Sequence, residues 1–241
     1  MPAFLEPGER QLSTEDANAT RLITILRWLI EARNGLIKSV FKFLAQTMQI
    51  QHLPNVGDFY KIAGAMINRY HPPITMEGAD ADRARALLER AERNNVVQRL
   101  VEENNLATRN AQRWIRLDQE HLQDFPQLTI DYLRDLTTGI YQIKLSPSYI
   151  QDTLQREETY EFQIEMLRET NRLPEPGLLR ARVYSRFCNA AKHQMWITYQ
   201  PVGVDHDENT NENADLITGH YCICRSGART LGTCAHVTSV L

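Results

Sequence analysis

Three of the chain's four cysteines lie beside a histidine near the end of the sequence, in the stretch YCICRSGARTLGTCAH (221–236). Thiolate sulfur and imidazole nitrogen are the usual ligands of structural zinc, which takes four of them in a tetrahedron. Alternation along a strand would place Cys222 and Cys224 on one face, and a glycine-containing loop would bring two further ligands back to them. The spacing therefore predicts one zinc site, with the ligands Cys222, Cys224, Cys234 and His236.

Four protein ligands fill a tetrahedral site, so the pattern predicts a structural zinc ion and not a catalytic one. The alternative is a set of buried or surface thiols that are close in sequence without a shared ion. A disulfide between Cys222 and Cys224 is a poorer alternative, because a spacing of two residues strains the bridge. Cys188 stands apart from this cluster, and we expect it to be an ordinary packing residue of a strand.

The composition is that of an intracellular globular protein. Of 241 residues, 42% are hydrophobic and 24% are charged, and no run of eighteen apolar residues predicts a membrane span. The first residues, MPAFLEPGERQ, lack the profile of a signal peptide. Four cysteines are too few for a disulfide scaffold in a chain of this length. We expect a nuclear or otherwise intracellular protein without a membrane partner.

Hydrophobic periodicity divides the chain at the turn-rich segment NRLPEPG (171–177). Before this segment the patterns predict helices at 13–48, 57–69, 80–104 (one or a pair), 106–118, 128–142 and 147–170. After it, period-two alternation predicts strands at 178–187, 193–202 and 219–225. The predicted fold class is α+β, with a mainly helical first two-thirds followed by a small antiparallel sheet.

The pattern C-x-C, a spacer and then C-x-H resembles the SWIM-type zinc finger, a small β-β-α module of transposases and chromatin-associated proteins. The resemblance covers roughly the last forty residues. It implies that the chain binds zinc and has DNA or another protein as its partner.

With that module placed, QLSTEDANATRLITILRWLIEARNGLIKSVFKFLAQ (11–46) resembles the end of the catalytic domain of Harbinger-like DDE-superfamily transposases. The match places Glu31 at the family's third catalytic acid. It implies a remnant of an RNase H-like catalytic domain at 1–75, a helical region at 76–172 and a β-rich region with the zinc finger at 173–241.

The departure from this family concerns catalysis. DDE chemistry needs two aspartates and a glutamate to hold a pair of Mg²⁺ ions, and both aspartates precede the glutamate by a long stretch. Only thirty residues precede Glu31, and Asp16 matches neither family position. We therefore expect a chain that begins inside the catalytic domain, ends inside the zinc finger's helix and is not an enzyme. The alternatives are a Mg²⁺-dependent endonuclease whose aspartates come from elsewhere, and a transposon remnant without activity.

The net charge of −3 does not by itself indicate a nucleic-acid-binding protein, but its distribution is uneven. Residues 10–70 hold eight Lys and Arg against four acids. RARVYSRF (180–187) would place a basic and aromatic face on one strand, and two further arginines lie in the zinc loop. The predicted DNA contacts are Arg180, Arg182, Arg186, Arg225 and Arg229, with an ordinary solvated sheet face as the alternative for the strand.

Overall fold

The computed structural model describes residues 2–73, 81–108, 114–117, 124–156, 163–167, 177–185, 192–201 and 215–241. The chain forms two compact units: residues 20–87 make the first, and residues 2–19 together with 88–241 make the second. The fold is α+β, as the sequence predicts, with helices in both units and an antiparallel sheet in the second. None of the described helices has both the length and the apolar composition that a membrane span requires.

The first unit is helical and contains the helix expected at 57–69 and most of the segment expected to be helical at 13–48, whose first residues, up to 19, belong to the second unit. Helix α1 begins with a side-chain cap: the Asp16 amide donates to Ser13 Oγ at 3.0 Å, and Ser13 Oγ donates to Asp16 Oδ2 at 2.9 Å. A small core of Ile37, Leu44, Ala63 and Ile67 joins the helices. The elements are α1 (Thr14–Val40), α2 (Lys42–Ala45), the 3₁₀ helix η1 (Ile50–Asn55) and α3 (Val56–Tyr70).

In the second unit, the segment 80–104 is a pair of helices. They are α4 (Ala81–Glu92), whose first residues belong to the first unit, and α5 (Val96–Glu103). Asn95 separates them because its side chain caps α5, accepting from the Gln98 amide at 2.9 Å. The remaining described helices are α6 (Ile130–Leu136), α7 (Tyr141–Arg156) and α8 (Ala235–Thr238).

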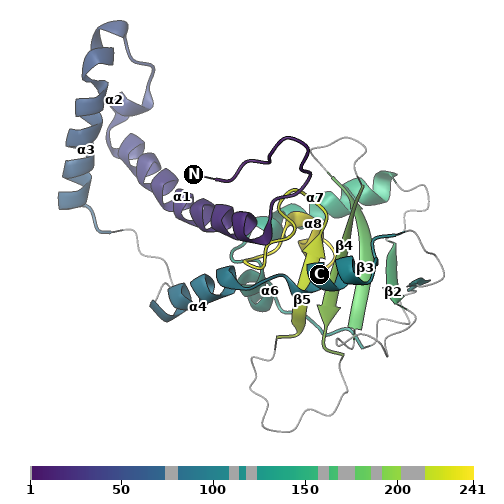
Figure 1. Cartoon of the computed structure of the whole chain (residues 1–241). Coiled ribbons are helices and arrows are strands. Elements are labelled where there is room, and N and C mark those ends of the chain that lie inside the picture. Colours follow the sequence, from purple (N-terminus) through teal and green to yellow (C-terminus); the bar gives the residue numbers. More distant parts are fainter. Residues whose placement is uncertain are drawn as a thin grey trace. The chain divides into compact units, whose positions relative to one another are not determined.

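The sheet described in the second unit has five strands, all antiparallel, in the order β1-β2-β3-β4-β5. One face, here the α5 face, carries Leu178, Trp196 and Tyr221 and packs against α5. The opposite face, here the α8 face, carries Leu179, Ile197 and Cys222 and packs against α7 and α8 (Figure 1). The strands are β1 (Trp114–Arg116), β2 (Ile164–Leu167), β3 (Gly177–Tyr184), β4 (Lys192–Tyr199) and β5 (Ile217–Cys222).

Two predicted helices are wrong in part, because segments of both are strands of this sheet. Within 106–118 the structure has β1, and within 147–170 helix α7 is followed by β2. Trp114 pairs with Leu167 across the two strands, and both side chains are buried on the α5 face. Strands this short carry too little periodicity to be recognised, so long-range pairing decided their structure.

Helices pack against both faces of the sheet, so the expectation that Arg180 contacts DNA from a solvent-exposed face is wrong. Arg180 shares the α5 face with Trp196, its neighbour across β3 and β4, but its side chain is only 2% exposed. Its guanidinium lies 4.0 Å from the centre of the Trp114 ring and pairs with Glu165 at 2.7 Å. Burial lowers the pKa of Arg180. This arginine holds β2 and β3 together and presents no charge to a DNA phosphate.

We predict that Glu165→Gln destabilises the second unit by about 3 kcal/mol, because it leaves the buried Arg180 charge without its counter-ion. Urea unfolding followed by tryptophan fluorescence measures the change. The matched control is Asp131→Asn, which removes a 2.9 Å ion pair with the half-exposed Arg134. That loss should cost under about 1 kcal/mol. Equal costs for the two variants would contradict a structural role for the Arg180–Glu165 pair.

Candidate metal centre

The four predicted ligands converge at one end of the sheet, on the α8 face. Cys222 ends β5, Cys224 lies in the turn that follows, Cys234 caps α8 and His236 lies within it. Their ligand atoms all lie within 4.8 Å of one another, and all four residues are buried. A tetrahedral ion with bonds of about 2.0–2.3 Å needs ligand atoms about 3.8 Å apart. The cluster could therefore hold one metal ion after a small inward adjustment.

A turn brings the first two cysteines together, where the sequence pattern predicts a continuous strand to 225. Strand β5 ends at Cys222, whose amide donates to the Gly227 carbonyl at 3.1 Å. The Gly227 amide in turn donates to the Cys224 carbonyl at 3.0 Å. A Cβ at position 227 would lie 2.1 Å from the Cys222 carbonyl oxygen, so the turn requires glycine. Gly232 has φ +68°, which permits the second reversal before Cys234.

The three thiols lie so close together that their pKa values differ. Burial raises the pKa of Cys222, whereas hydrogen bonds from Cys222 and Cys224 lower the pKa of Cys234 well below its ordinary value. Hydrogen bonding among the three thiols thus favours ionisation of Cys234 over that of Cys222. Bound metal would replace this sharing by coordinating all three sulfurs as thiolates.

His236 is available for coordination. Both of its ring nitrogens are buried, neither makes a hydrogen bond of good geometry within the described residues, and the ring interacts with the Cys234 sulfur. Its ring packs edge-on against Tyr149, with centroids 5.1 Å apart, and lies 4.7 Å from the ring of His193. Both contacts restrict the ring's rotation beside the three sulfurs. A buried imidazole without a partner is costly, and a metal ion would satisfy it.

Arg229, predicted to contact DNA, belongs to this centre. Its side chain is buried, it donates to the Thr233 carbonyl, and its guanidinium interacts electrostatically with the three cysteines, with Cys234 first. Burial lowers its pKa, and the cysteine charges oppose that shift. The interpretation of Arg229 as an exposed DNA contact is wrong, because the loop folds its side chain inward.

The remaining predicted DNA contacts have different environments. Arg182 is partly exposed and lies 3.9 Å from Glu165, while Arg225 is exposed on the metal loop. Arg186 and Cys188 lie outside the described residues. Glu31, in the first unit, is exposed and pairs with Arg27 at 2.8 Å. Among the described residues, no group of three or more potential metal ligands contains Glu31.

Three side-chain amides hold the metal loop, here residues 223–233, from outside. Gln11 Nε2 donates to the carbonyls of Cys222 and Cys224 at 2.6 and 2.8 Å, and its Oε1 accepts from the Tyr221 hydroxyl at 2.8 Å. Asn95 Nδ2 donates to the carbonyl of Ala228 at 2.9 Å. These amides satisfy backbone groups that the loop cannot satisfy within itself.

Asn18 is the third amide and makes four contacts. Its Oδ1 accepts from the amides of Thr230 and Leu231 at 2.9 and 3.0 Å. Its Nδ2 donates to Thr230 Oγ1 and to the Ala91 carbonyl, both at 2.8 Å. Asn18 is 1% exposed, so water cannot replace these bonds. It joins the start of α1, the end of α4 and the metal loop.

We predict that Asn18→Ala lowers the free energy of unfolding of the second unit by about 3 kcal/mol, since it strands two buried amide donors. Chemical denaturation measures the change. Asn104→Ala is the control, because the exposed Asn104 side chain donates to Leu100 within its own helix end. That variant should cost about 1 kcal/mol or less. An Asn18→Ala protein as stable as the control would contradict the role given to this amide.

The site was also compared with known proteins through the whole chain. No family model, no curated protein and no solved structure matches it. The resemblances drawn from sequence motifs therefore receive no support from these comparisons.

Proposed function

We propose that Cys222, Cys224, Cys234 and His236 bind one Zn²⁺ ion that stabilises the second unit. The observation that carries this proposal is the convergence of four buried sulfur and nitrogen donors within 4.8 Å. Three thiolates and one imidazole form a ligand set typical of structural zinc. The set contains no carboxylate or carbonyl oxygen, the ligands that Mg²⁺ and Ca²⁺ prefer.

The proposed role of the ion is structural. Four protein ligands complete the tetrahedron, and each ligand residue is at most 8% exposed, so no position faces a substrate. Three thiolates and a divalent cation leave one net negative charge, which the buried Arg229 guanidinium balances. The order of β4, β5, metal loop and α8 agrees with the β-β-α arrangement of a SWIM-type finger and supports that assignment.

DNA is the proposed partner, and exposed cations support it. The burial of Arg180 and Arg229 leaves Arg225 as the exposed arginine of the metal loop. The first unit adds exposed cations of its own, such as Lys38, Lys42 and Arg69. Contacts of this kind bind phosphates without reading sequence, so affinity should depend strongly on salt.

The proposal includes the absence of catalysis by this chain alone. A two-metal nuclease needs several oxygen ligands around its ions, and Glu31 contributes one exposed carboxylate that is paired with Arg27. The alternative of a DDE endonuclease requires two aspartates that a partner chain or upstream sequence supplies, or that the sequence patterns did not reveal. An inactive transposon remnant is the further alternative, and it would bind zinc in the same way.

Purified under reducing conditions, the protein should contain one zinc ion per chain by elemental analysis. Cys234→Ser should lose the ion, whereas Cys188→Ser should retain it, because the ligand pattern does not include Cys188. Structural zinc contributes about 10–16 kcal/mol of apparent binding free energy in zinc-finger peptides. Chelation should therefore abolish amide protection in β5 and α8 while α3 stays protected. Zinc-free protein with full protection in α8 would exclude the proposal.

The logarithm of the DNA-binding constant should fall linearly with the logarithm of the salt concentration, with a slope of about −0.9 for each phosphate neutralised. Two variants test the cations: Arg225→Gln, and a double variant with Lys38→Gln and Lys42→Gln. Each should lower the affinity for DNA, and the decrease should be the same for different DNA sequences. Fluorescence anisotropy with two unrelated duplexes measures both effects. Plasmid nicking in Mg²⁺ that disappears in Glu31→Gln would instead establish the catalytic alternative.

A further inference from the structure

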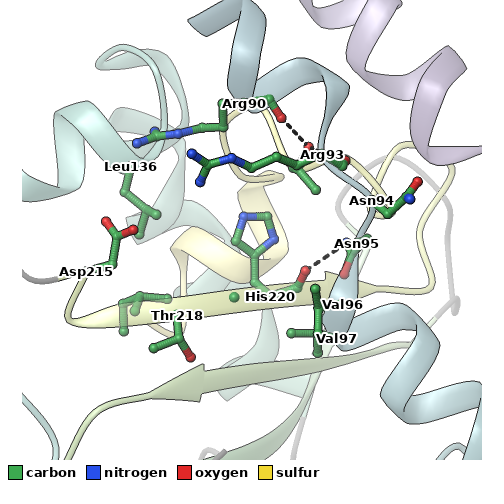
Figure 2. Close-up of a pocket in the computed structure, with 13 residues that line it drawn as sticks. Arg90, Arg93, Asn94, Asn95, Val96, Val97, Leu136, Asp215, Thr218 and His220 are labelled. Carbon is green, nitrogen blue, oxygen red and sulfur yellow. Dashed lines mark hydrogen bonds between the residues drawn. The ribbon is translucent and has the colours of Figure 1, made fainter. Parts of the chain in front are cut away.

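A second polar site lies in the second unit, in a cavity of about 220 Å³ where the end of α4 and the start of α5 meet the outer strand β5. Arginines 90 and 93 line it together with His220 and Asp215. Figure 2 shows both guanidinium groups extending in the same direction, toward the side of the cavity where Leu136 and Asp215 also lie. The cavity is separate from the metal ligands.

The floor of this cavity contains an unsatisfied donor or acceptor. His220 is 8% exposed, and its Nδ1 is buried without a hydrogen-bond partner among the described residues. In Figure 2 its ring points away from β5 toward the two arginines. The ring therefore lines the cavity while one of its nitrogens lacks a partner, and a small shift of the ring would let a ligand or bound water satisfy that nitrogen.

The walls are fixed before any ligand arrives. The carbonyl of Arg90 accepts from Thr230 Oγ1 at 2.8 Å, and the neighbouring Ala91 carbonyl accepts from Asn18. The His220 carbonyl accepts from Asn95 Nδ2 at 3.0 Å. The backbones that present both arginines and the imidazole are therefore held by three side-chain hydrogen bonds. A prearranged site loses little entropy when it binds.

The charge of the lining favours an anion. Two guanidinium groups on one side of a small cavity repel each other, and the lining supplies one acid, Asp215, against the two of them. Two arginine forks present more donors than one planar carboxylate can accept, whereas a tetrahedral phosphate accepts from several directions. Pockets for drug-sized ligands measure about 300–1,000 Å³, so this one suits a smaller group.

We propose that this cavity, here the phosphate pocket, binds the phosphate group of a small molecule. The two guanidinium groups of Arg90 and Arg93 contact the phosphate oxygens, and the His220 ring contacts the same group from below. Asp215 lies on the same side as the guanidinium groups and would accept a hydrogen bond from a hydroxyl or amino group of a phosphate monoester. The proposal for this pocket does not rest on the zinc proposal, because none of the metal ligands lines the pocket.

Isothermal titration calorimetry of the full chain tests the proposal with two probes, inorganic phosphate and a nucleoside monophosphate. Saturable binding is expected for at least one probe. Arg90→Gln and Arg93→Gln should each weaken it about tenfold or more, the effect of losing a charge-assisted hydrogen bond. Tighter binding of the monophosphate would identify an ester as the ligand, and equal binding would identify free phosphate.

Arg99→Gln is the matched control, since Arg99 is exposed on α5 but does not line the pocket. It should bind the probes as the unaltered chain does, and all three variants should keep the same thermal midpoint. Two results would overturn the proposal: the absence of saturable binding of both probes, or equal weakening by Arg99→Gln and the two pocket variants, which would indicate a general charge effect.

Discussion

Charge has to be balanced wherever three cysteine sulfurs and an imidazole are buried within 4.8 Å of one another. Low polarity around the centre makes an unpaired thiolate costly, and an unpaired guanidinium equally so. The Arg229 guanidinium beside the sulfurs balances one negative charge, and a divalent cation would balance the other two. Helix α8 depends on the same balance, because it is one turn long and two of the four ligands cap or occupy it.

The metal loop is held by residues that are distant in sequence. Gln11 and Asn18 contact it across more than 200 residues, and Asn95 contacts it across 133. Closing such long loops costs conformational entropy before the contacts stabilise anything. The shape of the folded loop therefore depends on the start of α1 and on the α4–α5 junction. This arrangement explains why residues 2–19 belong to the second unit although the rest of α1 lies in the first.

Sequence patterns predicted what depends on local periodicity and on ligand chemistry. Long helices such as α3 and the order of the last three strands follow from spacing, and the four ligands follow from residue type. The short strands β1 and β2 were missed because pairing, not propensity, determines them. Alternation in β3 was recognised, but no local pattern shows that α5 covers the face that carries Arg180. Gln11 and Asn18 carry no signal at all, since an amide's partner 200 residues away leaves no trace in one sequence.

The metal loop and the phosphate pocket share a structural element, and this has an energetic consequence. Thr230 Oγ1 donates to the carbonyls of residues 90 and 93 and accepts from Asn18 Nδ2. Asn18 also contacts the Leu231 amide of the same loop. An ion that orders residues 223–233 thereby orders the backbone that presents both pocket arginines. A ligand held by those arginines would in return favour the ordered loop, because coupling between two sites is reciprocal in free energy. The strength of this coupling depends on how much freedom the loop has without metal, and the three amides, by holding it from outside, limit that freedom.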